Sequence, residues 1–254
     1  MTKVIKNIQE WREIRSSNLL KNKSIGFVPT MGALHEGHLS LMRKSIKDND
    51  VTVVSIFVNP TQFNDKNDFN NYPQTFESDL EKLENVGVDY LFYPEYKQIY
   101  NDNFRYEVNE KELSTKLCGA HRPGHFTGVL TVLMKLLNII KPSKAYFGEK
   151  DYQQYLLIKG MAESFFLDCE IVPLPLIREK DGLAMSSRNK LLTENERKLA
   201  PRFYKWLSSD KSIDEIKKGL EKDGFIIDYI EEIDNRRFGA VHLGKVRLID
   251  NVKI

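Results

Sequence analysis

Two histidines, His35 and His38, stand three residues apart in the segment GFVPTMGALHEGH, residues 26–38. The chain has only five histidines, and this spacing puts both on one face of a helix that begins there. A helix start also carries unpaired backbone N–H groups and the positive end of the helix dipole, which favour an anion. Gly32 and Gly37 would let a ligand approach the backbone. The segment favours a polyanion site, although histidines that pack or cap the helix fit the pattern too.

Metal binding is the other chemistry that these histidines suggest. Zinc at the first pair is disfavoured because the metalloprotease motif needs histidines four residues apart. The segment LCGAHRPGH has Cys118, His121 and His125 at ligand-like spacing, but a fourth ligand is not evident and its proline and glycines indicate a loop. We therefore predict no metal site within the chain, and we interpret Arg122 as a contact for a phosphate or a substrate anion.

The segment FGEKDYQQ, residues 147–154, is a second junction between a strand and a helix. Gly148 permits close approach of a ligand to the backbone, and Lys150 supplies a positive charge. Asp151 can accept hydrogen bonds from ribose hydroxyls or cap the helix. Gln154 lies three residues further on, so it faces the same opening as Asp151.

Two more segments carry side chains suited to small anionic ligands. NPTQF ends an apolar run and places Asn59 and Gln62 above the expected sheet. AMSSRN offers the hydroxyls of Ser186 and Ser187 and the guanidinium of Arg188. This second segment suits a phosphate clamp, and a flexible linker is the alternative interpretation.

Alternating strands and helices must position these residues. The apolar run at 51–60 is typical of a strand buried on both faces. We expect strands at the N-terminus and at 24–29, 51–60, 89–94, 144–148 and 169–177, and helices after the first strand and at 37–49, 75–87, 128–142 and 151–166. This alternation predicts an α/β fold with a parallel sheet and helices on both faces. Ligands bind such sheets beyond the carboxyl ends of the strands.

The sequence changes character near residue 176. A polar linker precedes a helix that starts at Thr193, with Glu196 at capping-box spacing. A charged helix follows and ends at Gly224, and the segments IIDYIEEID and AVHLGKVRLIDNV resemble half-exposed strands. We predict two domains, a larger one at 1–175 and a small C-terminal α+β domain at 176–254.

The composition limits which kinds of partner we expect. The 254 residues are 41% hydrophobic and 29% charged, with a formal net charge of +2, and no basic block indicates a nucleic-acid partner. The longest apolar segment, VLTVLMKLLNII, is interrupted by Lys135 and Asn138 and is too short to span a bilayer. The N-terminus has no apolar signal core, and two cysteines do not make a disulfide framework. We expect a cytoplasmic protein without a membrane partner.

Six segments together resemble one known family: PTMGALHEGH, SIFVNPTQF, YPQTFESDLEKL, RPGHFTGVLTVLMKLLNI, FGEKDYQQ and DGLAMSSRN. They are similar to segments of the pantothenate synthetase, or pantoate–β-alanine ligase, family, over roughly residues 25 to 200. That family belongs to the nucleotidyltransferase superfamily, whose HIGH-type and KMSKS-type signatures correspond to residues 35–38 and 185–188. The resemblance implies a Rossmann-like N-terminal domain, a C-terminal lid, a homodimer, and ATP with Mg2+ on its phosphates.

The resemblance also implies a two-step ligation. The carboxylate of pantoate attacks the α-phosphorus of ATP to give pantoyl adenylate and pyrophosphate, and the amine of β-alanine then displaces AMP to give pantothenate. A carboxylate is already ionised at neutral pH, so the first step needs alignment and charge stabilisation rather than a general base.

Roles for individual residues follow from the same resemblance. His38 is the foremost catalytic residue, assisted by His35, Lys150 and Arg188, and Gln62 and Gln154 bind pantoate and β-alanine. The residues expected to bind ATP are Met31, Gly32, Ala33, Leu34, His35, Glu36, Gly37, His38, Gly148, Glu149, Lys150, Asp151, Ile177, Met185, Ser186, Ser187 and Arg188.

The chain departs from the family pattern in two places. Cys118 stands where the family typically has a glutamate, and the chain is shorter than usual around residues 207–215. Four other functions remain alternatives: a nucleotidyltransferase without an amine acceptor, an aminoacyl-tRNA synthetase, a nucleotide-sensing module, and a zinc-dependent hydrolase built on Cys118, His121 and His125.

Overall fold

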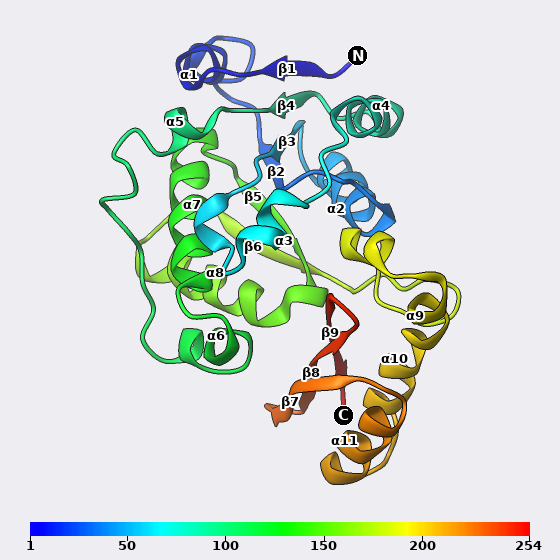
Figure 1. The fold of residues 1–254 in the computed structure, drawn as a ribbon. Helices are drawn as coiled ribbons and strands as arrows, with labels where there is room; N and C mark the ends of the chain where they lie inside the picture. Colours follow the sequence, from blue (N-terminus) through cyan, green and yellow to red (C-terminus); the bar gives the residue numbers. More distant parts are fainter.

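The computed structural model describes all 254 residues. Six parallel strands form one sheet in the order β1-β4-β3-β2-β5-β6 (Figure 1). The strands are β1 Lys3–Ile5, β2 Ile25–Thr30, β3 Val51–Ile56, β4 Tyr90–Phe92, β5 Lys144–Gly148 and β6 Glu170–Leu174. Because β2 pairs with both β3 and β5, the strand order reverses there, and a crevice is expected beyond the carboxyl ends of β2 and β5. The predicted fold class is confirmed.

Helices cover both faces of this sheet (Figure 1). One apolar cluster joins the sheet to α1 Ile8–Ser16, α7 His125–Ile140 and α8 Tyr152–Ser164. A second cluster joins the other face to α2 Glu36–Asp48 and α4 Phe76–Val86. The shorter helices are α3 Lys66–Asn70, α5 Tyr96–Ile99 and α6 Cys118–His121. None of the helices combines the length and apolar character that crossing a membrane requires.

The strand β3 is shorter than the apolar run that predicts it. All six of its residues are buried, as expected, but it ends at Ile56 rather than at residue 60. A 3-10 helix, Pro60–Gln62, follows, since proline has no N–H to donate to a sheet and its φ suits the start of a helix. Gln62 therefore belongs to this short helix rather than to the strand, and it lies beyond the carboxyl end of β3.

The C-terminal part consists of three helices and an antiparallel sheet in the order β7-β8-β9. Its elements are α9 Glu194–Leu199, α10 Pro201–Leu207, α11 Ile213–Lys222, β7 Ile226–Ile233, β8 Arg236–Leu243 and β9 Val246–Lys253. The predicted cap of α9 is present: Thr193 and Glu196 bond each other's backbone N–H reciprocally. Figure 1 shows this part below the parallel sheet, on the side of the carboxyl ends of the strands.

The prediction that the C-terminal strands are half-exposed is wrong for β8. Seven of its eight residues are buried, because the antiparallel sheet has apolar contacts on both faces. Val241 packs in a cluster with Phe203 of α10 and Leu220 of α11. Phe238 and Ala240 instead join the large apolar cluster that includes α7 and α8.

The segment after β6 is more ordered than a plain linker. Arg178 and Ala184 form an isolated antiparallel bridge, and Arg178 donates two hydrogen bonds to the carboxylate of Asp250, at 2.6 and 2.9 Å. A 3-10 helix, Ser187–Leu191, follows. These contacts attach the AMSSRN segment to β9 and hold it next to the parallel sheet.

Candidate active site

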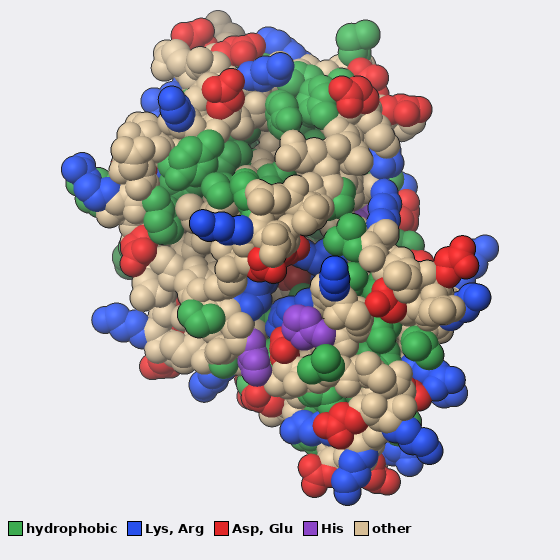
Figure 2. Space-filling model, viewed as in Figure 1, with side chains coloured by type: hydrophobic (Ala, Val, Ile, Leu, Met, Phe, Trp, Pro, Cys, Tyr) green, Lys and Arg blue, Asp and Glu red, His purple; other side chains and the backbone are tan.

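A cavity of about 250 Å³ lies beyond the carboxyl ends of β2 and β5. The structure brings together in its lining most of the residues that the sequence singles out: Met31, His35, Gly37, His38, Gln62, Gly148, Lys150, Asp151, Gln154, Ile177, Met185, Ser186, Ser187 and Arg188. Side chains of both charge signs surround the hollow between the upper and lower parts of the molecule (Figure 2). Segments far apart in the sequence therefore share one cavity.

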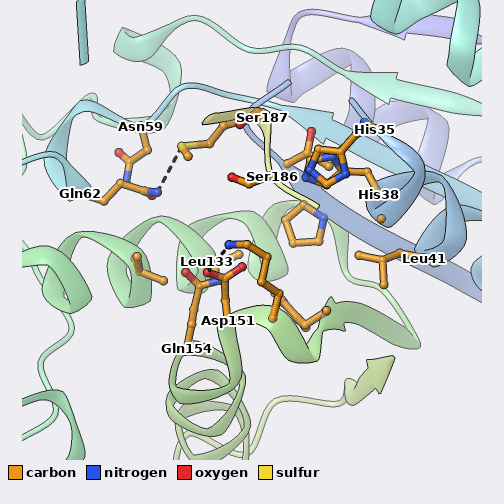
Figure 3. A pocket seen from close by; sticks show the side chains of 18 of the residues that line it. His35, His38, Leu41, Asn59, Gln62, Leu133, Asp151, Gln154, Ser186 and Ser187 are labelled. Carbon is orange, nitrogen blue, oxygen red and sulfur yellow. Dashed lines mark hydrogen bonds and ion pairs between the residues drawn. The ribbon is translucent and has the colours of Figure 1, made fainter. Parts of the chain in front are cut away.

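Three walls can be distinguished in this cavity (Figure 3). His35 and His38 lie on one side, at the start of α2, and Gln62 lies opposite them with Asn59. Gln154, which comes from α8, lies between the histidine wall and the Gln62 wall and is not counted as a wall. The remaining wall is an apolar face built largely by α7, namely Phe57, Val129, Val132, Leu133 and Leu136.

The two imidazoles are in contact, with ring centroids 4.0 Å apart. His38 Nδ1 accepts a hydrogen bond of 3.4 Å from the backbone N–H of His35, so the proton of a neutral His38 is on Nε2. Burial, with the nearby His35 and Lys150, lowers the pKa of His38 to about 3. Burial and Lys150 lower the pKa of His35 to about 4. Both rings are therefore neutral hydrogen-bond donors at neutral pH rather than cations.

The His35 ring has one polar atom without a partner. Its Nδ1 is buried and makes no hydrogen bond within the chain, which is uncommon for buried polar atoms. Gly37 makes room for this ring, because a Cβ there would lie 2.9 Å from His35 Cε1. Gly37 therefore admits the imidazole, in addition to any effect on ligand approach, and the free nitrogen is a position that a ligand or water can satisfy.

The loop between β2 and α2 is held by a carboxylate from α4. Asp79 is buried and accepts hydrogen bonds of 2.8 Å from the backbone N–H groups of Ala33 and Leu34. The N–H of Gly32 points to Thr30 Oγ1 at 3.1 Å. Gly32, Ala33 and Leu34 do not line the cavity, so the N–H groups of Ala33 and Leu34 serve the loop itself, while Gly37, at the start of α2, lines the cavity. No motif in the sequence indicated Asp79, which comes from a helix more than forty residues away.

Two acidic residues expected to bind ATP also lie outside the lining. Glu36 is exposed and paired with Arg43 on the outer face of α2. Glu149 forms an ion pair of 3.4 Å with Arg236 of β8. Neither side chain reaches the cavity, so neither is in place to contact a nucleotide there.

The orientation of Gln62 is determined by a buried amide. Asn59 Nδ2 donates to Gln62 Oε1 at 3.0 Å and to the carbonyl of Gly128 at 3.2 Å. Tyr100 donates its hydroxyl proton to Asn59 Oδ1 at 2.8 Å. Gln62 Nε2 then lies 3.2 Å from the sulfur of Met31 (Figure 3). With its oxygen occupied, Gln62 presents mainly an N–H group to a ligand.

Arg188 is not a free cation in this structure. Its Nη2 lies 2.8 Å from Asp68 Oδ2 and its Nε lies 3.3 Å from Asp68 Oδ1. The guanidinium carbon lies 5.5 Å from the centre of the Tyr72 ring, and the Tyr72 hydroxyl is 3.4 Å from Ser187 Oγ. Asp68 and Tyr72 were missed from the sequence, because no local pattern connects them with residues more than a hundred positions away.

The zinc alternative is not supported by the geometry. Cys118 Sγ lies 3.1 Å from the Tyr229 hydroxyl and 3.7 Å from two nitrogens of Arg247. His125 instead contacts the backbone carbonyl of Gln62 through its Nδ1, at 2.8 Å. No group of three or more His, Cys, Asp or Glu side chains is placed to hold a metal ion. The hydrolase alternative therefore loses its proposed ligand set.

Known proteins of one family are similar to this chain over its whole length. The family model described as pantoate-beta-alanine ligase matches residues 3–253. Pantothenate synthetase of Bdellovibrio bacteriovorus is 55% identical over 257 residues and covers the whole of both chains. Pantothenate synthetase of Coxiella burnetii is 51% identical over 252 residues, covering 99% of this chain and 97% of the relative.

Solved structures of the same family are also similar to this chain. The pantoate-beta-alanine ligase of Francisella tularensis, complexed with "Beta-gamma ATP and Beta-alanine", superimposes with a TM-score of 0.96 at 45% identity, over 100% of this chain and 98% of that one. Pantothenate synthetase of Thermus thermophilus gives a TM-score of 0.91 at 36% identity, over 99% of both chains. The chain belongs to the pantoate–β-alanine ligase family.

Proposed function

We propose that this enzyme, a pantoate–β-alanine ligase that produces pantothenate, works through pantoyl adenylate in the cavity described above. In the first step a carboxylate oxygen of pantoate attacks the α-phosphorus of ATP, and the bond from that phosphorus to the bridging oxygen of the β-phosphate breaks. Pyrophosphate leaves with the electron pair. In the second step the β-alanine nitrogen attacks the acyl carbon, AMP leaves, and the nitrogen loses two protons in passing from ammonium to amide.

ATP binding is supported by the meeting of three segments at one cavity. His35 and His38 come from the start of α2, Lys150 from the β5–α8 junction, and the Ser186–Arg188 segment from the C-terminal side. We assign these groups to the phosphates, and Asp151, the only carboxylate in the lining, to the ribose hydroxyls. The relative from Francisella tularensis, solved with an ATP compound, supports ATP as the ligand.

The neutral state of the histidines suits the first step. Negative charge moves onto the bridging oxygen and the pyrophosphate in the transition state, so preorganised N–H donors stabilise it without a proton transfer. His38 presents Nε2–H because its Nδ1 is occupied by the backbone of His35. This is the observation on which its proposed catalytic role depends most.

Pantoate fits the opposite half of the cavity. Gln62 and Gln154 offer neutral amides, and the α7 face offers an apolar wall for the two methyl groups of this acid. An arginine would bind the carboxylate more strongly, but it would also withdraw electron density from the attacking oxygen. Two amides are therefore suited to hold a nucleophile that must react.

Magnesium fits as a companion of the nucleotide rather than as an ion caged by protein. The lining contains a single carboxylate, Asp151, and Mg2+ typically keeps several waters and binds substrate phosphates. When bound, the ion would neutralise part of the phosphate charge. Lys150, with its Nζ 3.7 Å from Asp151 Oδ1, would act on the same charge from the protein side.

Three further expectations remain part of the proposal. We propose domains at 1–175 and 176–254, which is supported by a separate apolar cluster drawn from residues 183–248. We propose a homodimer, which light scattering of the purified enzyme would test against the monomer mass. We propose a cytoplasmic location, which is supported by two unpaired cysteines and by the use of ATP.

One assay separates this function from its alternatives. With ATP and pantoate alone the enzyme is expected to exchange labelled pyrophosphate into ATP, and AMP is expected only when β-alanine is added. A nucleotidyltransferase without an amine acceptor would release pyrophosphate but never AMP in response to β-alanine. A nucleotide-sensing module would show binding without either reaction.

A further inference from the structure

Arg122 is the one guanidinium lining the cavity that has no acidic partner. It is half-buried in the lining, between the start of α7 and the 3-10 helix that carries Gln62. The neighbouring arginines are paired: Arg188 with Asp68 at 2.8 Å and Arg247 with Asp228 at 2.7 Å. Burial, with the positive charges of these two arginines, lowers the pKa of Arg122 to about 10, so it still carries its charge at neutral pH.

Neutral groups hold Arg122 in place. Its Nη1 donates to His125 Nε2 at 3.0 Å, and its Nη2 donates to the backbone carbonyl of Gln62 at 3.2 Å. Since Nε2 of His125 accepts, its Nδ1 carries the proton and donates to the same carbonyl at 2.8 Å. Burial and the charge of Arg122 lower the pKa of His125 to about 3, so this imidazole stays neutral. The guanidinium is oriented by these bonds but not neutralised.

Arg122 also stands where two cavities meet. A second cavity of about 110 Å³ shares Arg122, Lys150, Asp151, Ser186 and Arg188 with the first. A cation that is partly removed from water and has no counter-ion is unfavourable, and a bound anion offsets that cost through charge-assisted hydrogen bonds. The position therefore calls for an anionic group of a ligand.

The neighbours of Arg122 indicate which ligand carries that anion. Through the backbone carbonyl of Gln62 it adjoins the pantoate half of the cavity, whereas His35 and His38 lie on the opposite wall (Figure 3). Lys150 and Arg188, which are also assigned to the phosphates, share the second cavity with Arg122, so the test includes a phosphate role as its contrary outcome. The acyl carbon of pantoyl adenylate must be attacked from this half. The attacking β-alanine has a carboxylate two methylene groups away from its amine.

We propose that Arg122 binds the carboxylate of β-alanine and selects an amino acid over a simple amine in the second step. This inference rests on the proposed two-step function. In that step the amine nitrogen forms its bond to the acyl carbon while the carboxylate stays on Arg122. The bond from that carbon to the adenylate oxygen then breaks, AMP leaves with the electron pair, and the two protons lost by the nitrogen pass to solvent. His125 is a positioning residue, since it acts only through the guanidinium.

The test separates the two steps in Arg122→Gln and Arg122→Lys. Pantoate-dependent exchange of pyrophosphate into ATP, which reports the first step, is expected to fall much less than kcat/KM for β-alanine in both variants, and any fall reflects the bond from Arg122 to the Gln62 backbone. The KM for β-alanine is expected to rise about thirtyfold or more in Arg122→Gln, the scale of losing a charged hydrogen-bonded pair, and less in Arg122→Lys. Arg105→Gln, which removes an exposed arginine elsewhere, controls for net charge.

A second substrate makes the result specific. 3-Aminopropanamide, which has the amine but no carboxylate, is expected to be a poor substrate of wild type and an equally poor one of Arg122→Gln. If the variant instead loses pyrophosphate exchange tenfold with the KM for β-alanine unchanged, Arg122 serves the phosphates and the proposal is wrong. Absence of pantoate-dependent exchange in wild type would overturn the proposed function itself, which is a different outcome.

Discussion

Asp68 and Arg188, 120 residues apart in the sequence, are joined by two hydrogen bonds, and both line the second, smaller cavity. Asp68 belongs to α3, and Arg188 belongs to the 3-10 helix that leads into the C-terminal part. The pair therefore connects the two parts of the molecule, and it also occupies the guanidinium that we assign to the phosphates of ATP. If Arg188 binds the phosphates as proposed, Asp68 and the nucleotide compete for the same cation.

Replacing Asp68 by Asn tests this competition. The ligand-free variant is expected to lose about 1 kcal/mol of stability, the scale of a partly exposed ion pair. Saturating ATP is expected to recover most of that loss, because the phosphates then supply the missing charge to Arg188. Thermal unfolding with and without ATP measures both effects. An equal loss in both conditions would show that Arg188 stays on Asp68 when ATP binds.

Replacing His38 by Ala tests the donor proposed for the first step. Pyrophosphate exchange is expected to fall about a hundredfold or more, which is roughly 3 kcal/mol of barrier, while circular dichroism remains that of the wild type. His38→Gln, whose side-chain amide can place an N–H near Nε2, is expected to recover part of the rate. Turnover near wild type in a correctly folded His38→Ala enzyme would refute the role.

The lowered pKa values predict how stability and activity depend on pH. The pKa values are about 4 for His35 and about 3 for His38, against about 6.5 in the unfolded chain. The unfolded state therefore binds more protons between these values, so stability is complete above pH 6.5 and falls as the pH drops from 6.5 towards 4. Urea unfolding at pH 7.5, 6 and 5 measures the fall, and His35→Asn is expected to reduce it.

The same pKa values have a consequence for catalysis. Since both imidazoles of the free enzyme remain neutral down to about pH 5, kcat/KM for pyrophosphate exchange, which reports the free enzyme, is expected to show no step near pH 6.5 that belongs to either ring. A titration of kcat/KM near pH 6.5 that disappears in His38→Gln would mean that His38 takes up a proton near that pH in the free enzyme.

Replacing Gln154 by Arg tests why a neutral amide faces pantoate. The charged side chain is expected to keep or strengthen the binding of pantoate and yet slow its adenylation, because it withdraws electron density from the attacking carboxylate. Single-turnover formation of the adenylate, measured with saturating pantoate and ATP, isolates that step. An unchanged single-turnover rate would contradict this account of the glutamine.

Much of the fold could be predicted because its signals are local. The buried run at β3 and the capping box of Thr193 and Glu196 depend on residues within a few positions of one another. The boundary of β3 was missed, since Pro60 acts on the backbone after a segment whose apolar pattern continues. The burial of β8 was missed because its second face is covered by helices from the other part of the chain.

Part of the candidate site could likewise be predicted from local signals, and part depended on distant segments. The residue types at the starts of α2 and α8 and in the AMSSRN segment were sufficient to indicate a site for an anionic ligand, and the resemblance to a family implied that this ligand is ATP. The order of strands and helices placed these segments at one edge of a parallel sheet. The side chains of Glu36 and Glu149 turn to other partners and do not line the cavity, because a motif does not show which way a side chain turns.

The sequence by itself determined which elements form and which chemical groups they carry, since hydrophobic periodicity, caps and motifs are properties of neighbouring residues. Only the tertiary structure decided the charge state and the partner of each group. Asp79 occupies the N–H groups of the 33–34 loop, Asp68 holds Arg188, and Arg122 is left without a counter-ion. Such pairings join residues from distant segments, and they depend on how packing brings those segments together and removes them from water.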